Sequence, residues 1–528
     1  MQEEQKIEET SKNKNKETDE IIEKRKERLK EKFSSWAKDP YTLALIAILV
    51  FSIIIRLYYF FLTSQQPLWW DEAEYMSTAK HWALGTPFEF AALRMPLLIF
   101  LGAIFFKIGF TEVALKFLIT LFSIGLVVVS YFLVKEMYDK KIALIVAFMS
   151  SIFWLALFNT FRIHNDVPLM FLMYLALFFF WKGYIKGRNI KMMIYFGISA
   201  ALALLMKPTA GLLFISLVIF VVITERFAFI KRKELWLGIL TFFVIMSPYF
   251  IYSYSTYGTP LAFLGGSHVF SDPAGAASLP FAWQVLGFPQ WLLEWPFFIF
   301  FIIGLIVVFG ALFLKIDMIF KNKNKQDFAN LFIIIWFLIT LVYFIFIERG
   351  NPEDRWIMPV ILAIFIFSSK GVLFLYEFVK KYQKVIAIGL IIVILAFGFY
   401  LQFKHADSII KVKKDTYMPV KEASLWIKEN SNPDDVILSR SITQVTFYSE
   451  RKVYGFGSGM NESRFDALVA ETKPRYLLES IFEPNPAAWG YALPEKYNNI
   501  WKPVKVWFAD ETQQQAVLIV YERTRQLT

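Results

Sequence analysis

The sequence predicts a polytopic α-helical membrane protein with a small α/β domain at its C-terminal end. Of the 528 residues, 56% are hydrophobic and the mean hydropathy is +0.46, which is more apolar surface than a soluble domain can bury. Apolar runs of roughly 17 to 25 residues, the length that crosses a bilayer, recur between short basic loops. The chain contains no Cys, which excludes disulfides, thiol nucleophiles and iron–sulfur clusters.

The first 40 residues form a separate segment that is rich in Lys and Glu. They carry 11 basic and 11 acidic residues and have too little apolar content to build a core, so we expect a charged cytoplasmic tail over 1–40. This start does not fit a cleavable signal peptide. The first apolar run, 41–62, is therefore expected to be a signal anchor that opens a transmembrane region over 41–403.

The net charge of +11 indicates topology rather than a nucleic-acid partner. Residues 41–403 carry 28 basic and 18 acidic residues, and the basic ones cluster in short loops between apolar runs. Under the positive-inside rule these loops face the cytoplasm. The five loops contain Lys135, Lys140 and Lys141; Lys182, Lys186, Arg188 and Lys191; Arg226, Lys231, Arg232 and Lys233; Lys315, Lys321, Lys323 and Lys325; and Lys380, Lys381 and Lys384.

These loops and the apolar runs together predict about 11 transmembrane helices. The expected spans are 41–62, 114–134, 142–159, 167–181, 192–207, 210–224, 235–252, 294–314, 329–347, 357–379 and 385–403. The apolar segment 96–110 is too short to cross, and counting it would place every basic loop outside. We expect a re-entrant or in-plane helix there, within a long first external loop over 63–111.

The same parity places the C-terminal residues 404–528 outside the cytoplasm. Their composition changes to that of a small α/β domain. Helical spacing predicts a helix over 420–430, and short runs bounded by Pro, Asn and Asp predict strands. The expected strands are 434–441, 445–450, 475–480, 504–509 and 516–522.

The first cluster of candidate functional residues lies in the first external loop. Asp71, Glu72 and Glu74 follow the pair Trp69 and Trp70. On a helix Asp71 and Glu74 share a face, while Glu72 points elsewhere. Carboxylates in a dry loop with aromatic walls are expected to have a raised pKa, which suits a general base. The alternative is an interfacial loop with solvated acids.

The second cluster lies in a short turn between two predicted spans. It contains Arg162, His164, Asn165 and Asp166. Polar residues that persist beside an apolar bundle are candidates for function. The alternative is that Arg162 and Asp166, which are four residues apart, only pair with each other.

Two further clusters place cations on the external side, against the charge bias of the chain. Lys207 precedes Pro208 at the outer end of a span, where a snorkelling side chain is the alternative. The loop over 348–359 contains Arg355, which lies next to the start of the following helix and is expected to reach inward. A solvated loop is the alternative for its other charged residues.

External carboxylates and cations at one surface of a bundle suggest an anionic lipid-linked substrate. The cations would hold a phosphate, and a carboxylate would deprotonate an acceptor hydroxyl or amine. Phosphate is a good leaving group, so such a transfer needs one base and charge neutralisation.

Four motifs carry a resemblance to a known superfamily, in the order in which they occur. They are the pair Asp71 and Glu72, the run RIHND over 162–166, the run MKPTAGLL over 206–213 and the run DRWIMP over 354–359. This pattern, over about residues 41–460, resembles the GT-C glycosyltransferases, and within them the protein O-mannosyltransferases and aminoarabinose transferases. The resemblance implies a GT-C-like bundle that transfers a sugar, with inversion, from a polyprenyl-phosphate donor to a protein, lipid or glycan acceptor. It implies a multi-pass protein of the plasma membrane, in contact with membrane lipids. The positive-inside rule gives this protein a cytoplasmic N-terminus.

The resemblance also implies roles for individual residues. It makes Asp71 the base with Glu72 beside it and Asp166 a second carboxylate. It makes Lys207, Arg355 and Arg162 contacts of the donor phosphate. The remaining pocket or acceptor contacts that it implies are Glu74, Tyr75, His164 and Asn165.

One position departs from the aminoarabinose transferases. Arg94-Met95-Pro96 stands where those enzymes share a Glu-Lys-Pro-Pro run, which argues against lipid A as the acceptor and against a metal at that position. No cofactor is required by this interpretation, and a divalent metal is possible but not indicated.

Two alternative functions stay open at this point. A transporter or flippase of a lipid-linked glycan would use charges buried within the spans, and Arg56, Lys116 and Glu377 are the nearest candidates. An oligosaccharyltransferase-like enzyme would need a diphosphate donor and usually a divalent metal. The 4 His residues and scattered acids provide no evident metal set.

Overall fold

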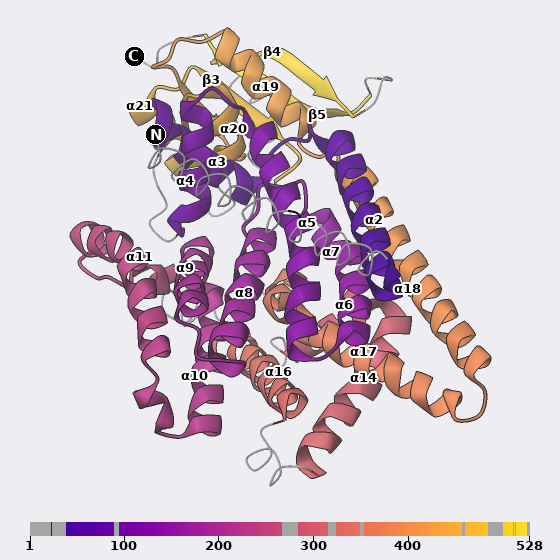
Figure 1. The fold of residues 1–528 in the computed structure, drawn as a ribbon. Coiled ribbons are helices and arrows are strands. Elements are labelled where there is room, and N and C mark those ends of the chain that lie inside the picture. Colours follow the sequence, from indigo (N-terminus) through magenta and orange to yellow (C-terminus); the bar gives the residue numbers. More distant parts are fainter. Residues whose placement is uncertain are drawn as a thin grey trace, which may run out of the picture.

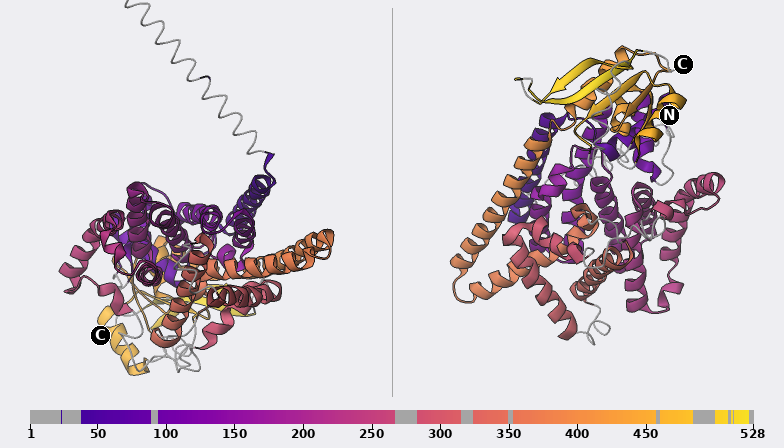
Figure 2. Two further views of the ribbon diagram at one scale, coloured as in Figure 1. Left: turned by 60° about the horizontal axis from the view of Figure 1, so that its bottom comes forward. Right: turned by 180° about the vertical axis from the view of Figure 1, so that it is seen from behind.

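The computed structural model of the chain describes residues 23, 38–88, 94–266, 283–314, 324–348, 353–456, 460–483, 500–509, 512 and 514–524. It consists of a bundle of long helices with a small β-sheet at one end (Figure 1). Seen from behind, the sheet again covers that end of the bundle (Figure 2). Nearly all of the expected tail over 1–40 lies outside the described residues.

Within the described ranges, nine helices are long and apolar enough to cross a membrane. They are α2 (Pro40–Thr63), α5 (Glu112–Met137), α8 (Asp166–Phe180) with η1 (Trp181–Ile185), η2 (Pro208–Ala210) with α10 (Gly211–Glu225), α11 (Lys233–Tyr257), η5 (Trp283–Gly287) with α14 (Phe288–Leu314), α16 (Lys325–Val342) with η6 (Tyr343–Ile347), η7 (Asp354–Val360) with α17 (Ile361–Lys380), and α18 (Lys384–Lys413) with α19 (Met418–Glu429). These nine correspond to nine of the predicted spans. The chain is therefore a multi-pass membrane protein.

The other two predicted spans have different forms. The span expected over 192–207 is α9 (Ile190–Met206), a helix of 17 residues. The span expected over 142–159 is divided into α6 (Lys140–Ile152) and α7 (Trp154–Phe158), because Phe153 leaves the helical conformation. Two short 3₁₀ turns, η3 (Ala228–Lys231) and η4 (Ala262–Gly266), flank α11.

The break between α6 and α7 is stabilised by a buried arginine on α2. Arg56 is fully buried and donates to the carbonyl oxygens of Ser151 at 2.9 Å and Ser150 at 3.3 Å, and to the hydroxyl of Ser123 at 2.8 Å. A broken helix leaves its last carbonyl groups without intrahelical partners, and inside a membrane these must be satisfied by protein. Arg56 therefore caps α6 where the chain turns into α7.

Lys116 has a comparable structural role at the C-terminal end of α2. Its ammonium group donates to the carbonyl oxygens of Gln66 at 2.5 Å and Ser64 at 3.2 Å. Glu377 is more than half exposed and pairs with Lys380 at 3.2 Å. The three charges that could have favoured transport thus have structural partners, which weakens the transporter alternative.

A second broken helix lies near α7. Glu294 within α14 has φ 56° and ψ 167°, a backbone region that only glycine adopts without strain. Gln402 of α18 links the two breaks, since its amide donates to the carbonyl of Leu292 at 2.8 Å and accepts from the N–H of Trp154 at 2.9 Å. This bridge fixes the start of α7, which leads directly into the second polar cluster.

The described residues of the loop over 63–111, which the sequence predicts to be external, include two helices that pack between the bundle and the sheet (Figure 1). They are α3 (Trp70–Leu84) and α4 (Pro96–Lys107). With 12 residues, α4 is about 18 Å long and cannot cross a bilayer. This length agrees with the prediction of a helix that does not span.

The C-terminal domain is a five-stranded mixed sheet with the order β2-β1-β3-β5-β4. The strands are β1 (Val436–Ser439), β2 (Lys452–Tyr454), β3 (Tyr476–Ser480), β4 (Trp501–Phe508) and β5 (Ala516–Arg523), and the helices are α19, α20 (Ile442–Ser449) and α21 (Glu462–Thr472). Strand β1 is parallel to β2 and β3, with Ile437 opposite Tyr476, and β5 is antiparallel to β3 and β4. Four of the five predicted strands and the predicted helix over 420–430 are present.

The strand predicted over 445–450 is wrong, because this segment belongs to α20. Its β-branched and aromatic residues are buried, and Phe447 packs on Phe106 of α4. The hydroxyl of Tyr448 accepts from the N–H of Leu68 at 2.9 Å. Contacts with Leu68 and with α4 therefore outweigh the local preference for a strand.

Candidate active site

The predicted site residues come together at the ends of four structural segments. Asp71, Glu72, Glu74 and Tyr75 lie in the first turns of α3. Residues 162–166 connect α7 to α8, and Lys207 and Arg355 lie in the segments that begin the next helices. The ten predicted residues form two groups of polar contacts, a larger one of eight residues and a smaller one that consists of Glu72 and Arg162.

Asp71 is the centre of the larger group. Its carboxylate lies 2.9 Å from Nη2 of Arg94, 3.2 Å from Nη1 of Arg355 and 3.5 Å from Nε2 of His164. Burial alone would raise the pKa of Asp71, but the hydrogen bond from His164 and the charges of Arg94 and Arg355 hold it well below its usual range. The raised pKa expected from the sequence is wrong, because cations rather than apolar groups surround this carboxylate.

Arg94 is a site residue that the sequence did not single out as one. Its guanidinium joins Asp71 to Glu74, whose carboxylate lies 2.6 Å from Nη2, and Nη1 lies 3.4 Å from the hydroxyl of Tyr75. Burial raises the pKa of Tyr75 to about 12, so this hydroxyl stays protonated. The signal that could have revealed Arg94 is a lone cation in a loop that the charge bias places outside.

Asp166 and Lys207 form the second ion pair of the larger group. Oδ1 of Asp166 accepts from Nζ of Lys207 at 2.6 Å, and Oδ2 lies 2.7 Å from Nδ1 of His164. Pro208 disfavours a helical conformation at the preceding residue, so α9 ends at Met206 and Lys207 is extended. The imidazole of His164 also contacts Nη1 of Arg355, which joins the two ion pairs.

Glu72 and Arg162 form the smaller group, which faces away from the first. Glu72 is almost fully buried and accepts from Arg162 at 2.6 Å. The guanidinium carbon of Arg162 lies 3.9 Å from the centre of the Trp69 ring, a cation–π arrangement. The alternative pairing of Arg162 with Asp166 is wrong, because Asp166 contacts Lys207 and His164 instead.

Two cavities meet at Asp71, Glu353 and Arg355. The larger, of about 540 Å³, is lined by Asp71, Glu74, Tyr75, Arg94, Met95, His164, Asn165, Lys207, Pro208, Thr209, Phe263, Leu264, Tyr343, Phe344, Glu348, Glu353, Arg355, Trp356 and Pro359. The smaller, of about 320 Å³, is lined by Trp69, Trp70, Asp71, Leu155, Phe158, Asn159, Arg162, Glu353, Asp354 and Arg355. Two carboxylates and one guanidinium thus line both cavities, an arrangement that suits a reaction between two bound molecules.

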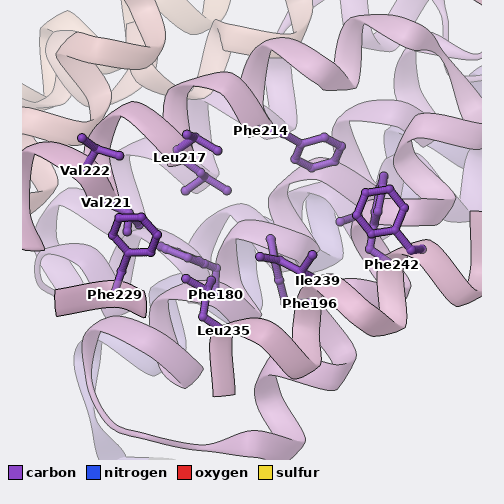
Figure 3. Close-up of a pocket in the computed structure, with 13 residues that line it drawn as sticks. Phe180, Phe196, Phe214, Leu217, Val221, Val222, Phe229, Leu235, Ile239 and Phe242 are labelled. Carbon is purple, nitrogen blue, oxygen red and sulfur yellow. The ribbon is translucent and has the colours of Figure 1, made fainter. Parts of the chain in front are cut away.

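A third cavity, between α9, α10 and α11, has a different character. All its lining side chains are apolar, as the phenylalanine, leucine, isoleucine and valine side chains in Figure 3 show. Its walls therefore offer no group that could bind a phosphate or move a proton. Of these three cavities, the two at Asp71 are lined by charged side chains and the third is not.

No group of three or more His, Asp or Glu residues that could hold a metal ion occurs in the part of the chain that the structure describes. The carboxylates of Asp71, Glu74 and Asp166 contact cations instead.

The chain resembles known proteins in part of its sequence and in its fold. Residues 93–252 match the model of the family described as dolichyl-phosphate-mannose-protein mannosyltransferase; this stretch contains Arg94, the 162–166 segment and Lys207. No curated protein sequence matches the chain.

Solved structures match over most of the chain. ArnT from Cupriavidus metallidurans in the apo state has a TM-score of 0.58 and 13% identity, covering 89% of this chain and 97% of ArnT. The same enzyme bound to undecaprenyl phosphate gives 0.58 and 14%, with the same coverage. The apo oligosaccharyltransferase of Archaeoglobus fulgidus gives 0.60 and 14%, covering 85% of this chain and 70% of that enzyme. These matches confirm the resemblance to the GT-C glycosyltransferases, and the chain has the fold of that superfamily.

Proposed function

We propose that this protein is an inverting membrane glycosyltransferase that moves a sugar from a polyprenyl-phosphate donor to an acceptor hydroxyl or amine on the extracytoplasmic face. The observation that carries the proposal is the position of Asp71, between two cavities and in contact with Arg94 and Arg355. An inverting glycosyl transfer needs the acceptor and the donor phosphate on opposite faces of the anomeric carbon, and it needs a base beside the acceptor. It also needs cations beside the departing phosphate.

The larger cavity is the donor site in this proposal. Lys207 and Arg355 both line it, and phosphate is bound well by a lysine point charge and an arginine fork. Asp166 holds Lys207 in place through its 2.6 Å contact. Donor phosphate would therefore lie between two cations that are already fixed by carboxylates and by His164.

The smaller cavity is the acceptor site, where Trp69 and Trp70 provide an aromatic wall. The acceptor oxygen or nitrogen attacks the anomeric carbon on the face opposite the phosphate and gives its proton to Asp71. The bond between that carbon and the phosphate oxygen breaks, and polyprenyl phosphate leaves with the electron pair. Lys207 and Arg355 neutralise its added negative charge.

The low pKa of Asp71 fits this sequence of events. In the free protein Arg355 is shared between Asp71 and other groups. A donor phosphate that binds Arg355 brings negative charge close to Asp71 and weakens this ion pair. Both effects raise the pKa of Asp71, so the carboxylate becomes a stronger base only when the donor is present.

The remaining predicted residues support the reacting groups. Glu72 neutralises Arg162 inside the protein, which fixes the start of the 162–166 segment against Trp69. Tyr75 accepts from Asn165 at 3.0 Å and so links α3 to α8. In this proposal Glu72 and Arg162 act through position rather than by contact with the reacting atoms.

Orientation in the plasma membrane is part of the same proposal. The reactive residues lie at the ends of α8, α9 and α17, and the basic residues Lys186, Arg188 and Lys380 lie at the opposite ends. The positive-inside rule then places the site and the sheet domain outside and the N-terminus in the cytoplasm.

Ligand-induced stabilisation in lipid nanodiscs tests the proposal. We expect undecaprenyl phosphate to stabilise the protein by about 2.7 kcal/mol at 100 times its Kd, and Arg355→Ala to remove most of this effect. Arg464→Ala is the matched control, because Arg464 is exposed on α21. Undecaprenyl diphosphate tests the oligosaccharyltransferase alternative. Stabilisation by the diphosphate alone, or by neither lipid, would contradict the proposal.

A further inference from the structure

The wall of the larger cavity contains polar atoms without partners. Oδ1 of Asn165 and Oγ1 of Thr209 are both buried and have no hydrogen-bond partner in the part of the chain that the structure describes. Both residues line the larger cavity. Buried polar atoms are nearly always paired in folded proteins, so two unpaired atoms beside one cavity point to a ligand that completes them.

Two other buried polar atoms, one on His164 in this wall and one on Asp166 behind it, have a different explanation. Nδ1 of His164 and Oδ2 of Asp166 also lack a hydrogen bond, but they lie 2.7 Å from each other. Each is the polar partner of the other, although the angle between them does not meet the geometry of a hydrogen bond. The polar atoms of this wall that remain without a hydrogen-bond partner are therefore those of Asn165 and Thr209.

The orientation of the Asn165 amide is fixed by its neighbours. Its nitrogen donates to the carbonyl oxygen of Met206 at 3.3 Å and to the hydroxyl of Tyr75 at 3.0 Å. A backbone carbonyl can only accept, so the amide nitrogen must face Met206. The oxygen is therefore the free atom, and Asn165, only 4% exposed, offers the cavity an acceptor.

The carboxylates of the same wall already have partners. Asp71 and Glu74 contact Arg94, Glu353 contacts Arg355, and Glu348 accepts a hydrogen bond from the hydroxyl of Tyr343. Lys207 is paired with Asp166, which lies behind the wall. A positively charged amino sugar would have to compete with these cations. The two unpaired groups, an amide oxygen and a hydroxyl, are neutral, and they fit neutral hydroxyl groups.

Resting on the proposed function, we infer that Asn165 and Thr209 form a subsite for hydroxyl groups of the donor sugar, and that this sugar is neutral. The sugar hydroxyls donate to Oδ1 of Asn165 and exchange a hydrogen bond with Thr209. Thr209 lies two residues after Lys207, and Asn165 precedes Asp166, the partner of Lys207. The subsite thus adjoins the cation that holds the phosphate, where a sugar bonded to that phosphate must lie.

Isosteric substitutions test the contacts with the sugar separately from the contacts with the phosphate. Thr209→Val keeps the shape of the side chain and removes a hydroxyl that has no partner in the free protein. We therefore expect unchanged thermal stability and an unchanged Kd for undecaprenyl phosphate, which has no sugar. The Kd for undecaprenyl phosphate that carries glucose or mannose should rise about 3- to 10-fold for the sugar that the site accepts, and Thr209→Ser should restore it.

Two further variants make the measurement specific. Thr340→Val is the matched control, because the buried hydroxyl of Thr340 already donates to the carbonyl of Trp336 at 2.9 Å outside the cavity. Asn165→Leu should also weaken binding of the neutral sugar lipid more than binding of the bare phosphate. An undecaprenyl phosphate that carries an aminopentose should bind more weakly than the neutral sugar lipids.

The outcomes distinguish the subsite from the proposed function. Suppose that the wild type binds undecaprenyl phosphate, but that Thr209→Val raises the Kd of no sugar lipid more than the Kd of the bare phosphate. The subsite is then wrong and the proposed function stands. Tighter binding of the aminopentose lipid would overturn the assignment of a neutral sugar. If the wild type binds none of these lipids, the proposed function is wrong and the subsite falls with it.

Discussion

Replacement of Arg94 by glutamine tests how the charge of Asp71 is controlled. In the structure Arg94 lies 2.9 Å from Asp71, and Arg355 and His164 also contact this carboxylate. An arginine beside an aspartate lowers the pKa of that aspartate by about 1 to 3 units. Loss of one of the three partners should therefore raise the pKa of Asp71 by about 1 to 3 units, while Arg355 remains.

The sign of the effect on activity follows from the role of the base. Asp71 must be ionised to accept a proton, so activity is present above its pKa and is lost as the pH falls through it. In the wild type this loss should occur only at strongly acidic pH, because the pKa of Asp71 is held well below its usual range. In Arg94→Gln the acidic limb of the pH profile should move to higher pH.

The assay is the pH dependence of kcat/KM for sugar transfer, which reports on ionisations of the free enzyme. Arg464→Gln removes the same charge from the exposed face of α21 and should leave the profile unchanged. Melting temperatures identify any loss of folding caused by the unpaired Glu74. An acidic limb that stays at the same pH in a folded Arg94→Gln protein would refute the reasoning, because either Asp71 is not the base or Arg94 does not control it.

Further predictions concern the base, the donor cation, the helix break and the topology. Asp71→Asn should lower kcat by about 10²- to 10⁴-fold with donor binding retained; unchanged turnover would assign the base elsewhere. Lys207→Gln should weaken donor binding and, because it removes the lysine partner of the buried Asp166 carboxylate, destabilise the fold by about 3 to 5 kcal/mol, as measured by denaturation in lipid. Arg56→Met should cost about 2 to 5 kcal/mol without changing the Kd for the donor among folded molecules, and a shifted Kd would mean that Arg56 reaches the site. A cysteine at Lys411 of this Cys-free chain should react with an impermeant reagent from outside and one at Arg188 should not, and the reverse pattern would invert the proposed topology.

The long helices could be predicted from the sequence because hydrocarbon imposes a length and an apolar composition on each span. The faces of α3 could be predicted as well, since helical periodicity separates Glu72 from Asp71 and Glu74. In the structure Glu72 contacts Arg162, and the other two carboxylates contact Arg94. These inferences depend on local periodicity and on the bilayer, which the sequence records directly.

Other features depend on contacts between distant segments and could not be predicted. Arg162 pairs with Glu72 rather than with the nearby Asp166 because α3 packs against the 162–166 segment. The pKa of Asp71 is lowered by residues 23 and 284 positions away in the chain. Segment 445–450 forms a helix because α3 and α4 offer it an apolar surface. In each case the deciding partner comes from another part of the chain.

The charged residues of the site follow a rule that links topology to function. Arg94, Lys207 and Arg355 all lie at the end of the bundle opposite the basic loops, where the charge bias of membrane proteins disfavours cations. Each of them contacts a carboxylate, which offsets the electrostatic cost of placing a cation at that end. If the cations served only the fold, apolar residues could replace each ion pair at little cost. Their presence around one cavity, together with unpaired neutral groups in its wall, is the arrangement expected of a site that exchanges its internal ion pairs for a phosphate when the donor binds.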